Sequence, residues 1–109
     1  MSTPANERRL YPRRPLRTPI VFEDEFGDGL FFVSSEDVSI GGLRLASDVP
    51  LRLGTLLFLS FALPGHKRPI RVTGEVVRRP EAGASGGGMG VRFIGLTDIA
   101  RRRLEAFLS

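Results

Sequence analysis

Alternating apolar and polar positions along most of the chain predict short β-strands with one buried face. Residues 70–76 and 89–93 alternate most cleanly. Residues 55–63 are instead almost continuously apolar and end at a Pro-Gly pair, which favours a strand buried on both faces. The expected strands cover residues 19–23, 30–33, 43–45, 55–63, 70–76 and 89–93.

Polar and glycine-rich segments separate these strands. Residues 24–29 are expected to form an acidic turn, and residues 37–42 interrupt the strand pattern before the third strand. Residues 81–88 are rich in Gly, Ala and Ser and predict a long loop that joins the last two strands as a hairpin. Three glycines lie in or beside strands, where glycine permits the tight bends of a closed sheet: Gly74, Gly90 and Gly95.

The hydrophobic period changes at the end of the chain and predicts a helix over 97–108. Thr97 is a suitable N-cap, with Asp98 close to the positive end of the helix. Arg101 to Arg103 are expected to point largely to solvent. One face of this helix is apolar and consists of Leu96, Ala100, Leu104, Phe107 and Leu108. The whole pattern predicts a mainly β protein, a small six-stranded antiparallel β-barrel (18–95) with a C-terminal helix.

Composition excludes several classes of protein. The 109 residues include no Cys, which excludes disulfides, thiol nucleophiles and thiolate-bound metals. The single histidine, His66, follows a Pro-Gly turn, so no histidine cluster for catalysis or metal binding can form. We therefore expect no enzyme activity, no metal and no cofactor. No apolar run approaches the ~20 residues of a membrane span, and residues 1–20 lack the apolar stretch of a secretory signal. A cytoplasmic location without membrane insertion is expected.

Positive charge is concentrated at the start of the chain. The protein has 16 Lys and Arg against 12 Asp and Glu, a net charge of +4. Residues 1–17 hold this entire excess, because they contain one acid, Glu7, and five basic residues: Arg8, Arg9, Arg13, Arg14 and Arg17. Three prolines, at positions 12, 15 and 19, restrict the segment towards extended conformations. We predict a disordered start (1–6) and a mobile arginine-rich arm (7–17) that binds an anion, the alternative being a solvated run of charge.

Two short motifs suggest which anion. Arg9 and Arg13 form R-x-x-x-R, and a guanidinium can donate two hydrogen bonds to a guanine base, stack on its ring or pair with a phosphate. Asp37, Ser39 and Gly42 form D-x-S-x-x-G, in which the carboxylate can accept from the guanine edge and Gly41 and Gly42 can bring backbone close to a ligand. The alternative for this second motif is a turn in which Asp37 or Ser39 bonds its own backbone.

In this order and spacing, E-R-R-x-x-P-R before the first strand and D-x-S-x-x-G about 24 residues later resemble the PilZ domain. The closing G-V-R-F of residues 90–93 is similar to the last strand of that family. The resemblance implies a small barrel with a C-terminal helix that binds cyclic di-GMP. It also implies ligand contacts from Arg8, Arg9, Arg13, Asp37, Ser39 and Gly42, with Gly41 as a further candidate. Many relatives carry an aromatic residue where this chain has Val77-Arg78-Arg79, and Arg78 can stack on a base in its place.

The function implied is a non-enzymatic receptor that transmits a cyclic di-GMP signal to a separate effector protein when its arginine arm becomes ordered. One alternative is a PilZ-like adaptor in motility or pilus function with weak or no nucleotide binding. Another is a barrel that binds single-stranded nucleic acid through the arm. Such proteins expose aromatic stacking platforms on a basic face, whereas Tyr11 is the only Tyr here, Trp is absent and the barrel is neutral, so nucleic acid is disfavoured.

Overall fold

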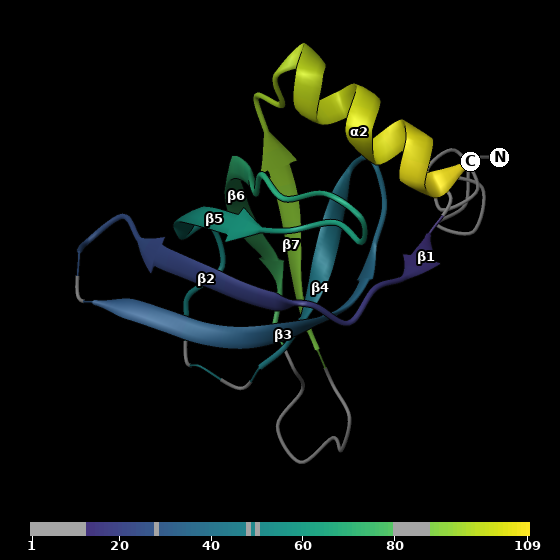
Figure 1. Cartoon of the computed structure of the whole chain (residues 1–109). Helices are drawn as coiled ribbons and strands as arrows, with labels where there is room; N and C mark the ends of the chain where they lie inside the picture. Colours follow the sequence, from purple (N-terminus) through teal and green to yellow (C-terminus); the bar gives the residue numbers. More distant parts are fainter. Residues whose placement is uncertain (1–12, 28, 48, 50, 80–87) are drawn as a thin grey trace, which may run out of the picture.

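The computed structural model describes residues 13–27, 29–47, 49, 51–79 and 88–109. Within these ranges the chain forms one β-barrel with a helix lying across one end of it (Figure 1). The seven strands are β1 (Arg14–Pro15), β2 (Pro19–Asp24), β3 (Leu30–Val38), β4 (Gly42–Ala46), β5 (Leu56–Phe61), β6 (Ile70–Arg78) and β7 (Met89–Ile94). The helix, α2, spans Asp98–Leu108.

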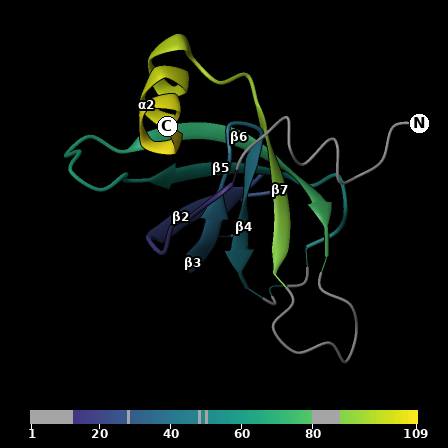
Figure 2. The same ribbon diagram turned by 90° about the vertical axis from the view of Figure 1, so that its right-hand side faces the viewer.

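The strands close on themselves through antiparallel pairs. Their order in the sheet is β1-β3-β2-β5-β6-β7-β4, and an additional pairing of β3 with β4 joins the two ends. Six strands, β2 to β7, make the closed barrel, while the two-residue β1 lies outside it and pairs with β3 at Val38 and Asp37. This arrangement confirms the predicted six-stranded antiparallel barrel with a C-terminal helix, and Figure 2 shows the barrel from the side.

The barrel interior is filled by the inward-facing residues of each strand. Aromatic rings pack in pairs: Phe22 stacks on Phe31 with ring centroids 5.0 Å apart, and Phe61 on Phe93 at 6.2 Å. Gly74 allows β6 to pass close to its neighbours, because a Cβ there would lie 2.4 Å from Val91 Cγ1. Because glycine has no Cβ, the side chains of Val91 and Leu59 fill that space. Fully buried residues of this core include Ile20, Phe22, Leu45, Leu57, Val76, Met89 and Leu104.

The helix begins and packs as the sequence predicts. The Thr97 hydroxyl accepts a hydrogen bond of 3.1 Å from the Ala100 amide, which makes Thr97 the N-cap, and Asp98 occupies the first turn. Ala100 and Leu104 are buried against the barrel. Arg101 and Arg102 are exposed, while Arg103 is half-buried and donates to the Arg68 carbonyl. Leu96, Phe107 and Leu108 complete the apolar side as partly buried residues.

Two strand predictions are wrong in ways that matter for the surface. β3 continues to Val38 instead of ending near Val33, because a bulge between Ser35 and Asp37 lets one strand pair first with β2 and then with β4. β5 is shorter than 55–63, and it is not buried on both faces. Its residues alternate between buried and accessible positions, so that Phe58 is exposed and Ser60 half-buried. An apolar residue in an outward position, Phe58, hid the alternation from the sequence analysis.

The end of the arginine-rich segment is part of the fold. β1 pairs with β3, and the Leu16 amide donates 3.1 Å to the Glu36 carbonyl. The Leu16 side chain is buried in the core. Residues 14–16 are therefore docked, which differs from the expectation of a mobile arm over 7–17. The reason is that Leu16, an apolar residue among the charges, has a place in the core. Residues 1–12 lie outside the described part of the chain.

Candidate functional site

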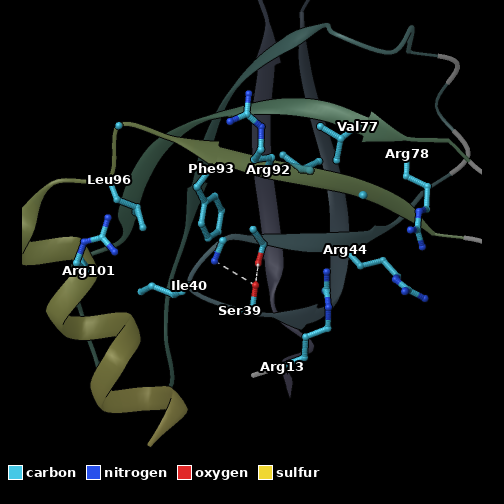
Figure 3. Close-up of a pocket in the computed structure, with 15 residues that line it drawn as sticks. Arg13, Ser39, Ile40, Arg44, Val77, Arg78, Arg92, Phe93, Leu96 and Arg101 are labelled. Carbon is cyan, nitrogen blue, oxygen red and sulfur yellow. Dashed lines mark hydrogen bonds between the residues drawn. The ribbon is translucent and has the colours of Figure 1, made fainter. Parts of the chain in front are cut away.

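A tight turn connects β3 to β4 and is organised by Ser39. The Ser39 amide donates to the Gly42 carbonyl at 2.8 Å, and the Gly41 amide donates to the Ser39 hydroxyl at 3.1 Å. The same hydroxyl lies 3.4 Å from the Gly42 carbonyl, to which it donates. Figure 3 shows both hydroxyl contacts as dashed lines. Ser39 is buried, so in this structure its hydroxyl holds the turn in shape.

Gly42 brings β4 against β7. A Cβ at Gly42 would lie 2.0 Å from the Val91 carbonyl oxygen, a distance that no side chain can occupy. The Phe93 amide donates 2.8 Å to the Gly41 carbonyl, which fixes the turn to β7 from the other side. The D-x-S-x-x-G motif thus includes a glycine, Gly42, that the pairing of β4 with β7 requires. The backbone of the turn is already hydrogen-bonded to β7 through the Gly41 carbonyl.

Asp37 sits beside this turn at the end of β3 and faces two arginines. Arg13 donates to Asp37 Oδ1, and Arg44 Nε lies 3.8 Å from Asp37 Oδ2. The register places Arg44 directly opposite Asp37 across the β3–β4 pair. Because about half of the Arg13 side chain is exposed, this ion pair is open to exchange with solvent or with another anion.

The turn, the end of β6, β7 and the start of α2 surround a cavity of about 550 Å³. Five arginines are among its lining residues. Figure 3 shows Arg101 on the helix side of Ser39 and Arg13 and Arg44 on the other, while the Arg92 side chain extends from β7 away from Ser39. Those five are Arg13, Arg44, Arg78, Arg92 and Arg101. The remaining lining residues are Ser39, Ile40, Gly41, Gly42, Val77, Gly90, Val91, Phe93, Gly95 and Leu96.

The lining of this arginine cavity carries positive charge without a carboxylate of its own. Among the described residues that line it, none is Asp or Glu. Arg92 donates to Glu75 on β6, and Arg13 to Asp37, so these two guanidinium groups have partners next to the cavity. Arg78 and Arg101 have no ion pair within the described part of the chain. The arrangement suits a polyanion that also carries flat groups, because guanidinium pairs with phosphate and stacks on rings.

Family comparison agrees with this geometry. The model of the PilZ domain family matches residues 7–109. The chain belongs to the PilZ domain family. That family consists of receptor domains for cyclic di-GMP. No curated protein sequence matches the chain.

Solved structures share the PilZ fold at low sequence identity. The motility inhibitor MotI (DgrA) of Bacillus subtilis matches with a TM-score of 0.76 at 20% identity, over 93% of this chain and 49% of that one, so this domain spans about half of MotI. The PilZ domain of YcgR from Escherichia coli, determined with c-di-GMP, matches with a TM-score of 0.67 at 14% identity, covering 93% and 88%. The PilZ domain of CeSA from a cellulose-synthesizing bacterium matches with a TM-score of 0.66 at 17% identity, covering 89% and 94%.

The structure of this PilZ domain brings together most of the residues that its sequence singles out. Arg13, Ser39, Gly41, Gly42 and Arg78 line the arginine cavity. Asp37 lies next to it through its contact with Arg13. Arg8 and Arg9 fall outside the described residues.

Three cavity arginines of this PilZ domain escaped the sequence analysis. Arg44 and Arg92 occupy accessible positions in alternating strands, and Arg101 lies on the helix among three consecutive arginines that were assigned to solvent. Alternation identifies an outward side chain, but it does not say that outward positions on β4, β7 and α2 face the same hollow. The pairing of β4 with β7 and the position of α2 place them together.

Other kinds of site receive no support within the described part of this PilZ domain. No group of three or more His, Cys, Asp and Glu that could hold a metal ion lies there. None of the described helices is long and apolar enough to cross a membrane.

Proposed function

We propose that this PilZ domain is a non-enzymatic receptor for cyclic di-GMP that holds the nucleotide in the arginine cavity. The observation that carries the proposal is that five arginines, one each from β4, β6, β7 and α2 and one just before β1, line one hollow whose described lining contains no acid. Cyclic di-GMP has two phosphates and two guanines, which match both modes of guanidinium binding. A cavity of about 550 Å³ is of the size that binds small molecules in proteins. The setting proposed for the receptor is the cytoplasm.

Arg13 exchanges partners when the nucleotide binds. In the structure its guanidinium is held by Asp37, which keeps it oriented at the rim of the cavity. A phosphate or guanine replaces the carboxylate as its acceptor, and Asp37 then accepts from the N–H donors of a guanine edge. Arg8 and Arg9 bind the same ligand from the preceding segment. Arg44 and Arg78 contact the phosphates or stack on the bases from the barrel.

Arg14 connects the segment that carries Arg13 to the helix α2. Its guanidinium lies 4.3 Å from the centroid of the Phe107 ring and also donates to the Phe107 carbonyl near the end of α2. A cation at that end of a helix is electrostatically favourable. Because Arg13 and Arg14 are neighbours, a ligand that moves Arg13 changes the restraint on Arg14. Ordering of the segment before β1, together with this contact, alters the surface offered to a separate effector protein.

A protein-interaction adaptor in motility or pilus function, with weak or no nucleotide binding, is the second candidate. The solved structure of MotI is described as an inhibitor of motility and that of the YcgR PilZ domain as holding c-di-GMP, so domains of this fold are described both with motility and with the nucleotide. The cavity arginines favour the receptor. The two candidates are separated by a nucleotide titration.

Isothermal titration with cyclic di-GMP, with GTP and a short single-stranded oligonucleotide as controls, tests the proposal. We expect saturable binding of cyclic di-GMP at micromolar affinity or tighter, and weakening of about tenfold or more in Arg13→Ala, because each charged hydrogen bond contributes ~1.5–3 kcal/mol. Arg52→Ala is the matched control, since Arg52 is exposed and does not line the cavity. Absence of heat with the wild-type domain at high ligand concentration contradicts the receptor and favours the adaptor.

A further inference from the structure

One face of the barrel exposes large apolar side chains that the core does not use. Phe32 is 74% exposed, Leu30 61%, Phe58 48% and Ile94 36%. All four are outward positions, and within its strand each lies next to a more buried residue. Single exposed apolar residues are ordinary, but several on one sheet face mark an interaction site.

The strand register places these residues together on adjacent strands. Leu30 on β3 lies beside Glu23 on β2, which lies beside Phe58 on β5. The same row continues to Thr73 on β6 and Ile94 on β7. The next row runs Phe32, Val21, Ser60 and Arg71. We call this surface, formed by Val21, Glu23, Leu30, Phe32, Phe58, Ser60, Arg71, Thr73 and Ile94, the β5 face. Figure 1 shows the strands that carry it, β3, β2, β5, β6 and β7.

The β5 face is hollowed beside Phe58. A cavity of about 370 Å³ lies there, lined by Phe58, Leu59, Ser60, Arg71, Val72, Thr73, Ile94 and Gly95. Apolar side chains around a hollow can receive a side chain from an opposing surface, which removes apolar area from water on both sides.

The β5 face carries two opposite charges placed on either side of β5. Glu23 lies on β2 and Arg71 on β6, and both are exposed. Neither has an ion pair within the described residues. Glu23 lies beside Phe58 on one side of β5, and Arg71 lies beside Ser60 on the other side. The two charges are therefore placed almost symmetrically about the point on β5 between Phe58 and Ser60.

We propose that the β5 face pairs with the β5 face of a second copy of this chain. A two-fold axis that lies in the contact plane and crosses β5 between Phe58 and Ser60 brings Phe58 of the two copies together. The same axis sets Glu23 opposite Arg71 of the second copy, and Arg71 opposite its Glu23. An isologous contact of this kind is self-complementary in charge. A contact between two barrels centred on β5 removes the exposed apolar residues nearest to β5 from water.

Charge complementarity is the reason for choosing a second copy over another protein. A different partner would need its own basic and acidic groups at the spacing of Glu23 and Arg71. A second copy supplies them automatically under two-fold symmetry. The contact does not use the arginine cavity, so it stands independently of nucleotide binding.

Sedimentation velocity of the full chain without nucleotide, from about 10 µM to about 1 mM, measures the association. We expect a monomer–dimer equilibrium. Phe58→Ser is expected to raise the dissociation constant by about tenfold or more, because a central aromatic contact carries much of the binding energy. Ile99→Ser is the matched control, since Ile99 is 70% exposed on α2 and lies off the β5 face. A single monomeric species at every concentration overturns the proposal and leaves the face to a different protein.

Charge reversal makes the test specific to the two-fold arrangement. Glu23→Arg alone and Arg71→Glu alone each place like charges opposite one another at both contacts, so each variant is expected to be monomeric. An equimolar mixture of the two variants is expected to form a heterodimer, in which every contact again joins opposite charges. Dimerisation of either variant alone at the wild-type affinity, or a mixture that stays monomeric, contradicts the proposed contact. Both substituted side chains are exposed, and circular dichroism checks that each variant folds.

Discussion

The arginine cavity and the β5 face are built on the same barrel by different means. The cavity depends on irregular features: the bulge in β3, the Ser39 turn and the glycine that lets β4 approach β7. The β5 face depends on regular pairing of β3, β2, β5 and β6, whose outward positions alternate without interruption. Irregular backbone thus gathers charged groups from distant segments, while regular register places apolar groups side by side on the outer surface of the barrel.

The comparison predicts that substituting a buried residue that supports the cavity lowers the free energy of unfolding more than substituting a residue on the β5 face. Leu16→Ala removes a buried side chain that anchors the segment carrying Arg13. We expect a loss of about 2–5 kcal/mol in the free energy of unfolding, measured by chemical denaturation. Phe58→Ser, at a half-exposed position on the face, is the control and is expected to lose clearly less. Equal losses in the two variants would contradict the docking of residues 14–16.

The role of Gly42 is tested by adding a single methyl group. Gly42→Ala places a Cβ 2.0 Å from the Val91 carbonyl oxygen, so β4 and β7 must move apart. We expect a loss of about 1–3 kcal/mol, as for other overpacked sites. Gly90→Ala is the matched control, because its Cβ would approach only Arg78, at 3.0 Å from the Arg78 Cβ and at 3.8 Å or more from the Arg78 backbone. The two variants should differ in thermal melting temperature, with Gly42→Ala lower.

Substitutions in the arginine cavity should weaken nucleotide binding, and substitutions on the β5 face should not. Arg44→Ala removes a cavity guanidinium and is expected to weaken cyclic di-GMP binding by about tenfold, since one charged hydrogen bond is worth ~1.5–3 kcal/mol. Arg71→Ala removes an arginine of the β5 face and is expected to leave affinity unchanged. Calorimetric titration of both variants measures the difference. An equal effect of the two substitutions would mean that the domain attracts the nucleotide only through its overall charge.

The smallest expected effect is that of Arg13→Ala on stability. Its ion pair with Asp37 joins one half-exposed and one less exposed side chain, and pairs of this kind contribute about 0–1 kcal/mol. Thermal unfolding without ligand should therefore barely change, although ligand affinity falls. A large loss of stability would mean that Arg13 serves the fold, and its effect on binding would then be indirect.

The sequence predicted the regular parts of the fold because local patterns determine them. Alternation over 70–76 and 89–93 identified β6 and β7, and Thr97 with the apolar period identified α2. The length of β3 could not be predicted, since the bulge after Ser35 depends on pairing with two different strands. The exposure of Phe58 was also missed, because an apolar residue facing outwards looks the same in sequence as one facing the core.

The part of the candidate site that local motifs specify could be predicted, and the part that depends on tertiary structure could not. The motifs identified Arg13, Ser39 and Gly42, and the structure places all three around one cavity. Arg44, Arg92 and Arg101 join them only through barrel closure and the position of the helix, which are tertiary features. The predictions for Arg8 and Arg9 concern residues outside the described part of the chain and remain predictions.

The central claim is that cyclic di-GMP occupies the arginine cavity and leaves the β5 face free. Titration of the isotopically labelled domain followed by two-dimensional NMR tests it directly, because every amide reports its own surroundings. We expect the amide signals of Gly41, Gly42 and Arg92 to shift in a saturable manner, while those of Val21, Phe58 and Thr73 stay in place. Signals that do not move at saturating nucleotide, or that move on the β5 face instead of around the cavity, would contradict the account.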